Sequence, residues 1–146
     1  MIRLAALLLV STWACVCQGQ VDFFQPRIKT ASACGFIVDR SGQGIPRAAL
    51  ALTNEAGTKS ETNSDEHGRF TFVQSSGSGW TLDVHVAGFI PASGIITKLR
   101  LASASRCDKP IYVVMGVGVN DYSYLTTNRT EIQKLKKAWT KGKDKK

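Results

Sequence analysis

The feature that most constrains the fold is an alternation of apolar and polar residues, which recurs between residues 34 and 119. The clearest stretch is WTLDVHV (80–86), where every second residue is apolar and those between are polar. Such alternation is typical of antiparallel strands that bury one face and expose the other. The faces predicted to be buried are Ala48, Leu50 and Leu52; Phe70 and Phe72; Trp80, Leu82, Val84 and Val86; and Ile111, Val113, Met115, Val117 and Val119.

Short segments rich in Gly, Ser, Asn, Asp and Pro separate these strands at intervals of roughly 8–12 residues. Residues of these types form tight turns, because they either tolerate unusual backbone angles or bond to their own backbone. About seven short strands at this spacing predict a two-sheet antiparallel β-sandwich. The segments are DRSGQGIPR (39–47), NEAGTKS (54–60), SDEHGR (64–69) and SSGSGW (75–80).

The N-terminal residues have the layout of a secretory signal peptide. Cleavage after Ala14 and cleavage after Gly19 both fit, and we place the peptide at 1–19. One positive charge precedes the apolar run LAALLLV (4–10), and small residues follow it. This run is too short to span a bilayer. Lipidation of Cys15 or Cys17 is an alternative, although neither follows the usual Leu-small-small pattern. No later segment is apolar enough for a transmembrane helix, so we expect a periplasmic or extracellular protein.

The predicted mature chain keeps two cysteines, Cys34 and Cys107. Export allows them to form a disulfide, which would close most of the domain into one loop. The alternative is a reactive thiol. Since the chain has no Cys-x-x-Cys motif and no histidine beside either cysteine, we predict the structural disulfide.

The positive charge is concentrated at the C-terminal end. The chain has a net charge of +8, and residues 129–146 contribute +6, from eight Lys or Arg against Glu131 and Asp144. No nucleic-acid-binding motif accompanies these charges, and export disfavours such a partner. The basic residues either contact an anionic surface or only keep the chain soluble; the lysines within the expected helix are Lys134, Lys136, Lys137 and Lys141.

We expect a helix over residues 130–140, because Thr130 and Gln133 form a capping-box pattern and an apolar stripe follows. The stripe consists of Ile132, Leu135 and Trp139. The predicted organisation is a signal peptide (1–19), an extended lead-in (20–33), a β-sandwich (34–119), a linker (120–128) and a basic helix and tail (129–146).

The segment SDEHGRFTF (64–72) offers two interpretations. Asp65, Glu66 and His67 could form a metal or acid–base site, but three consecutive side chains in a turn diverge, and a catalytic metal needs ligands around one point. The second interpretation is a tight turn between two strands, a hairpin corner, and it accounts for each residue. Asp65 caps the turn, and Gly68 supplies the positive φ that closes it. Phe70 and Phe72 then anchor the returning strand, so we predict the corner.

The segment GFIVDRSGQGIPRAALALTNEAGTKSETNSDEHGRFTF (35–72), followed by WTLDVHVAGF (80–89), resembles the carboxypeptidase regulatory-like domain of bacterial secreted and outer-membrane proteins. The resemblance covers about 34–119. Two positions depart from the family pattern. Ser64 stands where threonine usually precedes the motif aspartate, here Asp65. The segment SSGSGW (75–80) stands where the family often has Pro-Gly-x-Tyr at the start of the next strand. The matching positions are Gly35, Asp39, Gly42, Pro46, Ala48, Asp65, Gly68, Phe70, Phe72, Ala87, Gly88 and Phe89.

The resemblance implies a seven-stranded, transthyretin-like antiparallel sandwich without catalytic activity or cofactor. It further implies protein interaction or structural support in the bacterial envelope, with an unidentified protein or envelope partner. Carbohydrate binding is the alternative, since the wider fold group includes starch-binding-like sandwiches. A small hydrolase of the same fold is disfavoured, because this chain has only two histidines and lacks a C-terminal Tyr-Arg-Gly-Ser motif.

Two further sets of residues were considered as sites. Asp83 and His85 share the polar face of one predicted strand, but no candidate nucleophile lies near them in sequence, so we expect an exposed pair. Trp80 and Phe89 are predicted to be core residues rather than platforms for sugars. The aromatic residues expected at the surface are Tyr112, Tyr122 and Tyr124.

Overall fold

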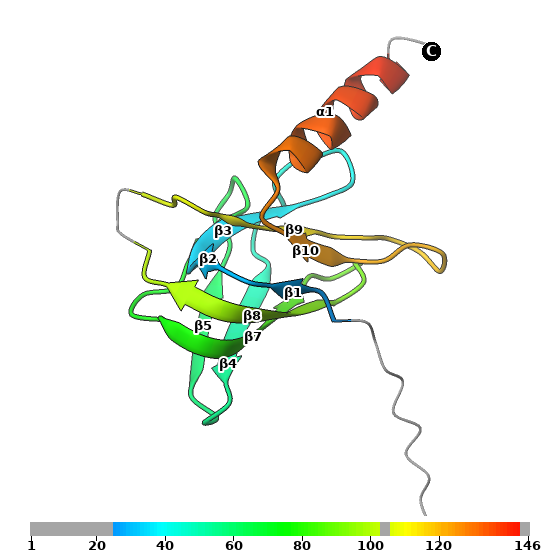
Figure 1. Cartoon of the computed structure of the whole chain (residues 1–146). Helices are drawn as coiled ribbons and strands as arrows, with labels where there is room; N and C mark the ends of the chain where they lie inside the picture. The colour runs from blue at the N-terminus through cyan, green and yellow to red at the C-terminus, as the bar shows by residue number, and fades with distance from the viewer. Residues whose placement is uncertain (1–24, 103–105, 144–146) are drawn as a thin grey trace, which may run out of the picture.

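The computed structural model describes residues 25–102 and 106–143 (Figure 1). The predicted signal peptide, with Cys15 and Cys17, lies outside the described residues. Two β-sheets pack against each other in a sandwich-like arrangement, and one helix projects from the C-terminal end. In the part of the chain that is described, no helix has the length and apolar character needed to cross a membrane.

The larger sheet has six strands in the order β1-β8-β7-β4-β5, and β2 also pairs with β8. Two hairpins, β4–β5 and β7–β8, form most of this sheet. They are joined by antiparallel pairing between β4 and β7. Its strands are β1 (Arg27–Ile28), β2 (Ala31–Ser32), β4 (Ala49–Asn54), β5 (Lys59–Asn63), β7 (Gly77–His85) and β8 (Ala92–Arg100).

The smaller sheet has four strands in the order β10-β9-β3-β6. At its centre β3 runs parallel to β9, with Gly35 opposite Ile111, and antiparallel to β6. This sheet therefore combines strands from both ends of the domain. Its strands are β3 (Cys34–Val38), β6 (Arg69–Thr71), β9 (Ile111–Val114) and β10 (Tyr124–Thr126).

The prediction of an all-β fold with a C-terminal helix is confirmed, but the strand number and strand directions were predicted wrongly. The described residues form ten strands rather than seven. Both sheets are mixed, because β1 and β2 run parallel to β8 and β3 runs parallel to β9. Apolar alternation reports which faces are buried and contains no information about the direction of the neighbouring strand.

Three of the additional strands lie in segments predicted to be irregular. The expected lead-in (20–33) contains β1 and β2, which pair with the edge of the larger sheet. The expected linker (120–128) contains β10, which pairs with β9. Each of these strands has only two or three residues, too few for a period-two pattern to appear.

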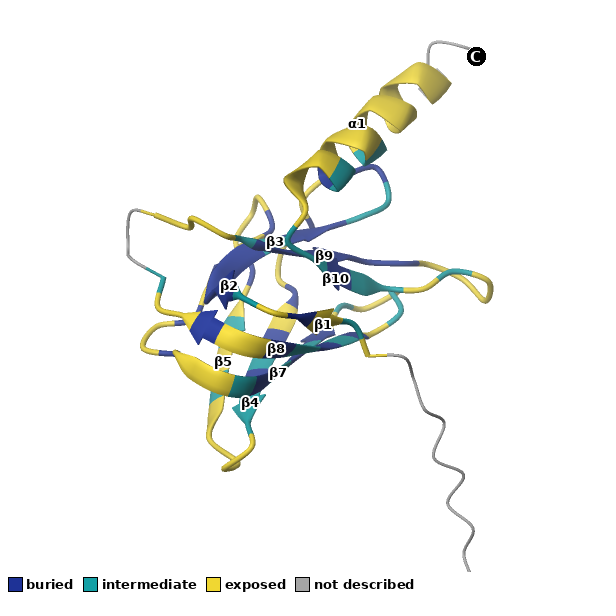
Figure 2. Cartoon of the chain, viewed as in Figure 1, coloured by how far each residue is buried: buried dark blue, intermediate teal, exposed yellow. Residues whose placement is uncertain are grey.

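The core lies between the inner faces of the two sheets (Figure 2). The faces predicted from alternation are mostly confirmed, with Ala48, Leu52 and Leu82 fully buried. Val117 and Val119 are exceptions, with 53% and 102% of their surface exposed. The strand β9 ends at Val114, and the positive φ of Gly118 turns the chain outward at a hairpin.

Gly35 allows the unusually close approach of β3 and β9. A Cβ atom on this residue would lie 1.8 Å from the carbonyl oxygen of Ile111 on the neighbouring strand. No side chain fits at that distance, so glycine is required here for close backbone contact.

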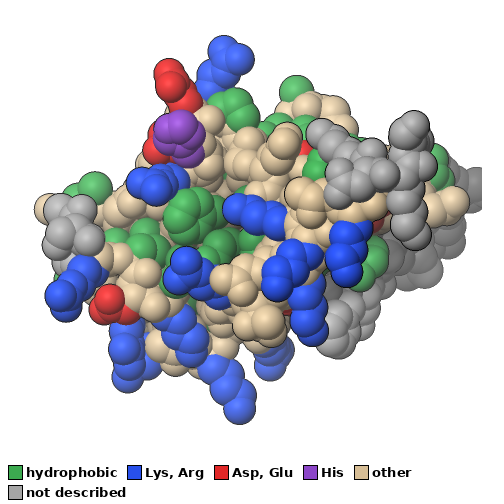
Figure 3. All heavy atoms as spheres, turned by 90° about the horizontal axis from the view of Figure 1, so that it is seen from above, with side chains coloured by type: hydrophobic (Ala, Val, Ile, Leu, Met, Phe, Trp, Pro, Cys, Tyr) green, Lys and Arg blue, Asp and Glu red, His purple; other side chains and the backbone are tan. Residues whose placement is uncertain are grey.

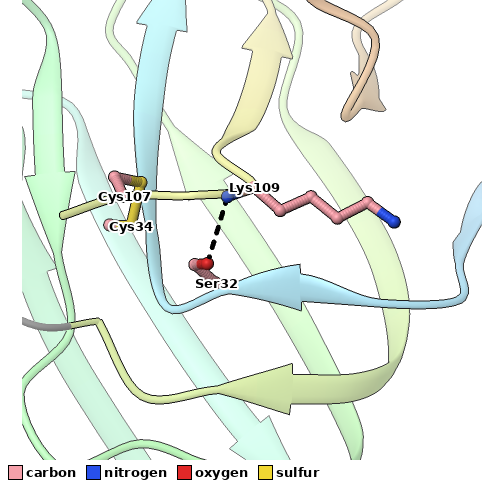
Figure 4. The surroundings of a disulfide bond; sticks show 4 residues. All are labelled: Ser32, Cys34, Cys107 and Lys109. Atoms are coloured by element: carbon pink, nitrogen blue, oxygen red, sulfur yellow. Dashed lines mark hydrogen bonds between the residues drawn. A yellow bond between two sulfur atoms is a disulfide. The ribbon is translucent and has the colours of Figure 1, made fainter.

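The disulfide predicted between Cys34 and Cys107 is present, with a Cα–Cα distance of 6.0 Å (Figure 4). Two hydrogen bonds lie beside it. The backbone N–H of Ser32 donates to the carbonyl of Lys109 (2.9 Å), and the N–H of Lys109 donates to the Ser32 hydroxyl (3.3 Å). The disulfide thus connects the segment before β9 to the start of β3, at one end of the parallel strand pair.

The helix α1 spans Arg129–Lys143, longer than the predicted 130–140. Asn128 acts as its N-cap, because its Oδ1 accepts the N–H of Thr130 at 3.0 Å. The predicted N-cap at Thr130 therefore lies two residues too late. Ile132 is buried and Leu135 half-buried against the outer face of the smaller sheet, whereas Trp139 is 49% exposed.

Candidate functional site

The corner SDEHGR (64–69) has the predicted turn geometry. Oδ1 of Asp65 accepts the backbone N–H groups of His67 (2.9 Å) and Arg69 (2.8 Å). The bond from Arg69 is the main reason why the pKa of Asp65 lies below its usual value. Gly68 has the expected positive φ of 76°. Among the described residues, no cluster of His, Cys, Asp and Glu could hold a metal ion.

This corner forms one wall of a hollow between α1 and the outer face of the smaller sheet. The hollow has a volume of about 330 Å³, and we call it the helix–sheet groove. The strands β3, β6 and β9 and the helix α1 all contribute side chains to it. Its floor consists of Phe36, Val38 and Tyr112, one wall of His67 and Arg69, and the other wall of Arg129, Ile132, Gln133 and Lys136.

The floor of the helix–sheet groove is an aromatic stack. The rings of Phe36 and Tyr112 lie 5.6 Å apart with an interplanar angle of 13°. The guanidinium of Arg69 lies over the other face of Phe36, 5.7 Å from the ring centroid. This cation–π contact orients Arg69 toward the groove. Tyr112 was predicted to be a surface residue, but it is only 7% exposed, because α1 packs over it through Ile132.

Lys136 differs from the other lysines of the helix. A Cβ atom on Gly42 would lie 2.6 Å from its Cγ atom, so its aliphatic stem lies against the Gly42 backbone, and the residue lines the groove. Three of the four lysines predicted to contact an anionic surface do not line the groove: Lys134, Lys137 and Lys141, all of which are exposed.

The cations of the helix–sheet groove form no salt bridge, although the charge of Arg69 interacts with the nearby Asp65 carboxylate. No Asp or Glu lines the groove. In residues 25–102 and 106–143, ion pairs join Arg40 to Asp121 and Lys59 to Glu61, whereas none involves Arg69, Arg129 or Lys136. Glu131, in the first turn of α1, instead bonds to Tyr124, whose pKa is raised to about 12, mainly by burial. Figure 3, seen from above, shows several Lys and Arg side chains beside a hydrophobic patch, with His and Asp or Glu side chains at the upper left and Asp or Glu at the lower left.

Arg40 holds the β9–β10 hairpin against the loop after β3. Its guanidinium pairs with the Asp121 carboxylate, donates to the carbonyl of Tyr122 (2.6 Å) and lies 4.8 Å from the Tyr122 ring centroid. The hydrogen bond from Arg40 is the main reason why the pKa of Asp121 falls to about 2. We assign this cluster a structural role.

This pairing predicts a pH-dependent stability. The folded-state pKa of Asp121, about 2, lies below the unfolded value of about 3.9, so the stabilisation is complete above pH 4 and disappears as the pH falls to 2. Asp121→Asn should therefore melt below the wild type at pH 6, and the difference should vanish near pH 2. Thermal melts of both proteins from pH 2 to 7 measure this. Arg40→Gln should give the same profile, and a pH-independent difference would contradict the assignment.

The outer face of the larger sheet has a second, polar hollow of about 540 Å³. The small residues Ala49 and Ala51 of β4 form its floor, between Glu61 on β5 and Asp83 and His85 on β7. His85 is exposed as predicted, and Asp83 is half-buried. Within the described part of the chain, no hydrogen bond or ion pair joins Asp83 to His85.

The remaining aromatic predictions are mostly confirmed. Trp80 is buried and donates its indole N–H to the Ser76 carbonyl (3.2 Å), and Phe89 packs partly against the core. Tyr122 is exposed and Tyr124 half-buried.

Sequence reasoning did not identify the helix–sheet groove. Arg69 and Arg129 were read only as part of a turn motif and of a basic tail. The signal available in the sequence was a basic residue at the end of the corner, together with a basic helix. The chain matches no protein-family model, and no curated protein matches it.

Proposed function

We propose that this chain is an exported, non-catalytic binding module of the carboxypeptidase regulatory-like type, which holds an anionic partner in the bacterial envelope or outside the cell. The ordered motif from Gly35 to Phe89 supports the family assignment. Ser64, where the motif usually has threonine, keeps a buried hydroxyl that donates to the Ile45 carbonyl and accepts the Ala48 N–H. The disulfide supports an oxidising compartment.

One observation supports binding of an anion: Arg69, Arg129 and Lys136 surround the helix–sheet groove, form no salt bridge and share the groove with no Asp or Glu. Cations placed together repel one another, and a domain that needed them only for solubility would gain by spreading them apart. Arg69 is also held in place by Phe36, so little conformational entropy is lost when it binds a carboxylate or phosphate.

Charge reversal tests this proposal. The triple variant R69E/R129E/K136E should bind immobilised polyglutamate and inorganic polyphosphate at least about tenfold more weakly than the wild type, because each charge-assisted hydrogen bond contributes about 1.5 kcal/mol or more. Biolayer interferometry at physiological ionic strength measures the affinities.

The matched control is K134E/K137E/K141E, which changes the net charge equally on residues that do not line the groove. Its affinity should fall by less than about threefold, through long-range screened charge alone. Equal losses in both variants would mean that the tail binds by unspecific charge. No binding by the wild type would refute the proposed function.

Carbohydrate binding is the second candidate function, favoured by the polar hollow on β4. Its carboxylates and the imidazole of His85 offer hydrogen-bond partners for sugar hydroxyls above the apolar floor. A glycan array would test it, and any hit should disappear in Asp83→Ala. An array without hits removes this function.

A further inference from the structure

We propose that the partner of the helix–sheet groove is an acidic polypeptide segment bound in extended conformation. This inference rests on the proposed function and names its ligand. Three features of the groove support it: the distribution of its cations, its stacked aromatic floor and its recessed shape.

The cations lie on both walls of the groove. Arg69 projects from β6 on one side, whereas Arg129 and Lys136 belong to α1 on the other. The two helix residues are seven positions apart, which corresponds to about 10 Å along the axis. The positive charge is therefore spread along and across the groove. An extended peptide matches this distribution, because its successive side chains point to opposite sides and it advances about 3.4 Å per residue.

The floor of the groove disfavours ligands that stack. Tyr112 covers one face of Phe36, and the guanidinium of Arg69 covers the other. Tyr112 itself is almost fully buried. Single-stranded nucleic acids bind largely by stacking bases on free aromatic faces, and the floor of Phe36 and Tyr112 offers none, so only the single exposed ring of His67 on the wall is left for stacking. A polypeptide needs no aromatic platform.

Gln133 makes the helix wall suited to a peptide backbone. It is exposed on the wall between Arg129 and Lys136. Its amide both donates and accepts, so it can pair with an N–H and a C=O of a bound main chain. Val38 on the floor and Ile132 on the helix wall are both buried and form the apolar part of the groove lining.

The shape of the site disfavours a membrane surface as the partner. The unpaired cations line a recess, and a flat bilayer cannot reach both walls of a recess at once. The lysines better suited to a flat surface are the exposed ones outside the groove, Lys134, Lys137 and Lys141. We therefore expect vesicle binding, if any, to depend on these lysines and not on Arg69.

The test uses two capped hexaglutamate peptides with the same charge. One contains only L-residues. The other alternates L- and D-residues, which places all carboxylates of an extended chain on one side. Fluorescence anisotropy with the purified mature protein should show that the all-L peptide binds at least fivefold more tightly. R69E should weaken all-L binding at least tenfold, and R69K about threefold, since lysine keeps the charge but loses the planar two-point contact.

Each outcome separates this inference from the proposed function. Equal affinity for the two peptides, or groove-dependent binding of tripolyphosphate alone, would overturn the acidic-peptide inference and leave anion binding in place. Binding to phosphatidylglycerol vesicles that is lost in R69E but kept in K134E/K137E/K141E would also overturn it. Failure of every anion to bind would refute both. Circular dichroism spectra of each variant should match the wild type, because Arg69 is exposed.

Discussion

Replacement of both Cys34 and Cys107 by alanine is expected to lower the free energy of unfolding by about 4 kcal/mol. The disulfide joins residues 73 positions apart, and a bond that closes a loop of this length strongly restricts the unfolded chain. Cys34 is also buried, so the variant loses some packing. Urea unfolding followed by the fluorescence of buried Trp80 measures the difference.

The matched comparison is the wild type in the presence of a reductant, which should unfold at nearly the same urea concentration as the double variant. A single variant, Cys107→Ala, should give a similar loss without removing the buried Cys34 side chain. If reduction changes the free energy of unfolding by less than about 1 kcal/mol, the entropic account of this disulfide is wrong.

Gly35→Ala is expected to be at least as damaging, with a loss of about 4 kcal/mol or more. The new Cβ would lie 1.8 Å from the carbonyl oxygen of Ile111 and 2.7 Å from its carbonyl carbon. Both contacts are with backbone, which cannot rotate away as a side chain could. The strands β3 and β9 would have to separate, and the smaller sheet depends on their pairing.

Gly57→Ala is the control for this substitution. Gly57 has a φ of 82°, but no atom lies within 4 Å of the added Cβ. Only backbone strain remains, so the loss should be about 1 kcal/mol. Chemical unfolding of both variants distinguishes the two causes. Similar losses would show that the close approach of β3 and β9 relaxes easily.

The buried faces were predictable because period-two alternation is a direct consequence of one-sided burial. Leu52, Leu82 and Ile111 are core residues for that reason, and all three have no exposed surface. The corner was predictable because Asp65 and Gly68 act locally, through bonds within four residues. Local chemistry of this kind is visible in the sequence.

The pairing of distant strands was not predictable. Alternation in IYVVMGVGV does not reveal that Ile111 pairs with Gly35 in a parallel ladder. The helix–sheet groove was missed for the same reason. Its side chains come from β3, β6, β9 and α1, and only the completed fold brings Arg69 opposite Arg129. The burial of Tyr112 likewise depends on where α1 docks.

The parallel pairing of β3 with β9 also determines the order in which the molecule can assemble. The hairpins β4–β5 and β7–β8 join neighbouring segments and can form while synthesis continues. In contrast, β3 must wait for a partner more than 70 residues downstream, and such distant contacts form slowly. Because α1 follows both, the helix–sheet groove is completed last. Binding through this groove would therefore distinguish chains that contain α1 from those terminated before it.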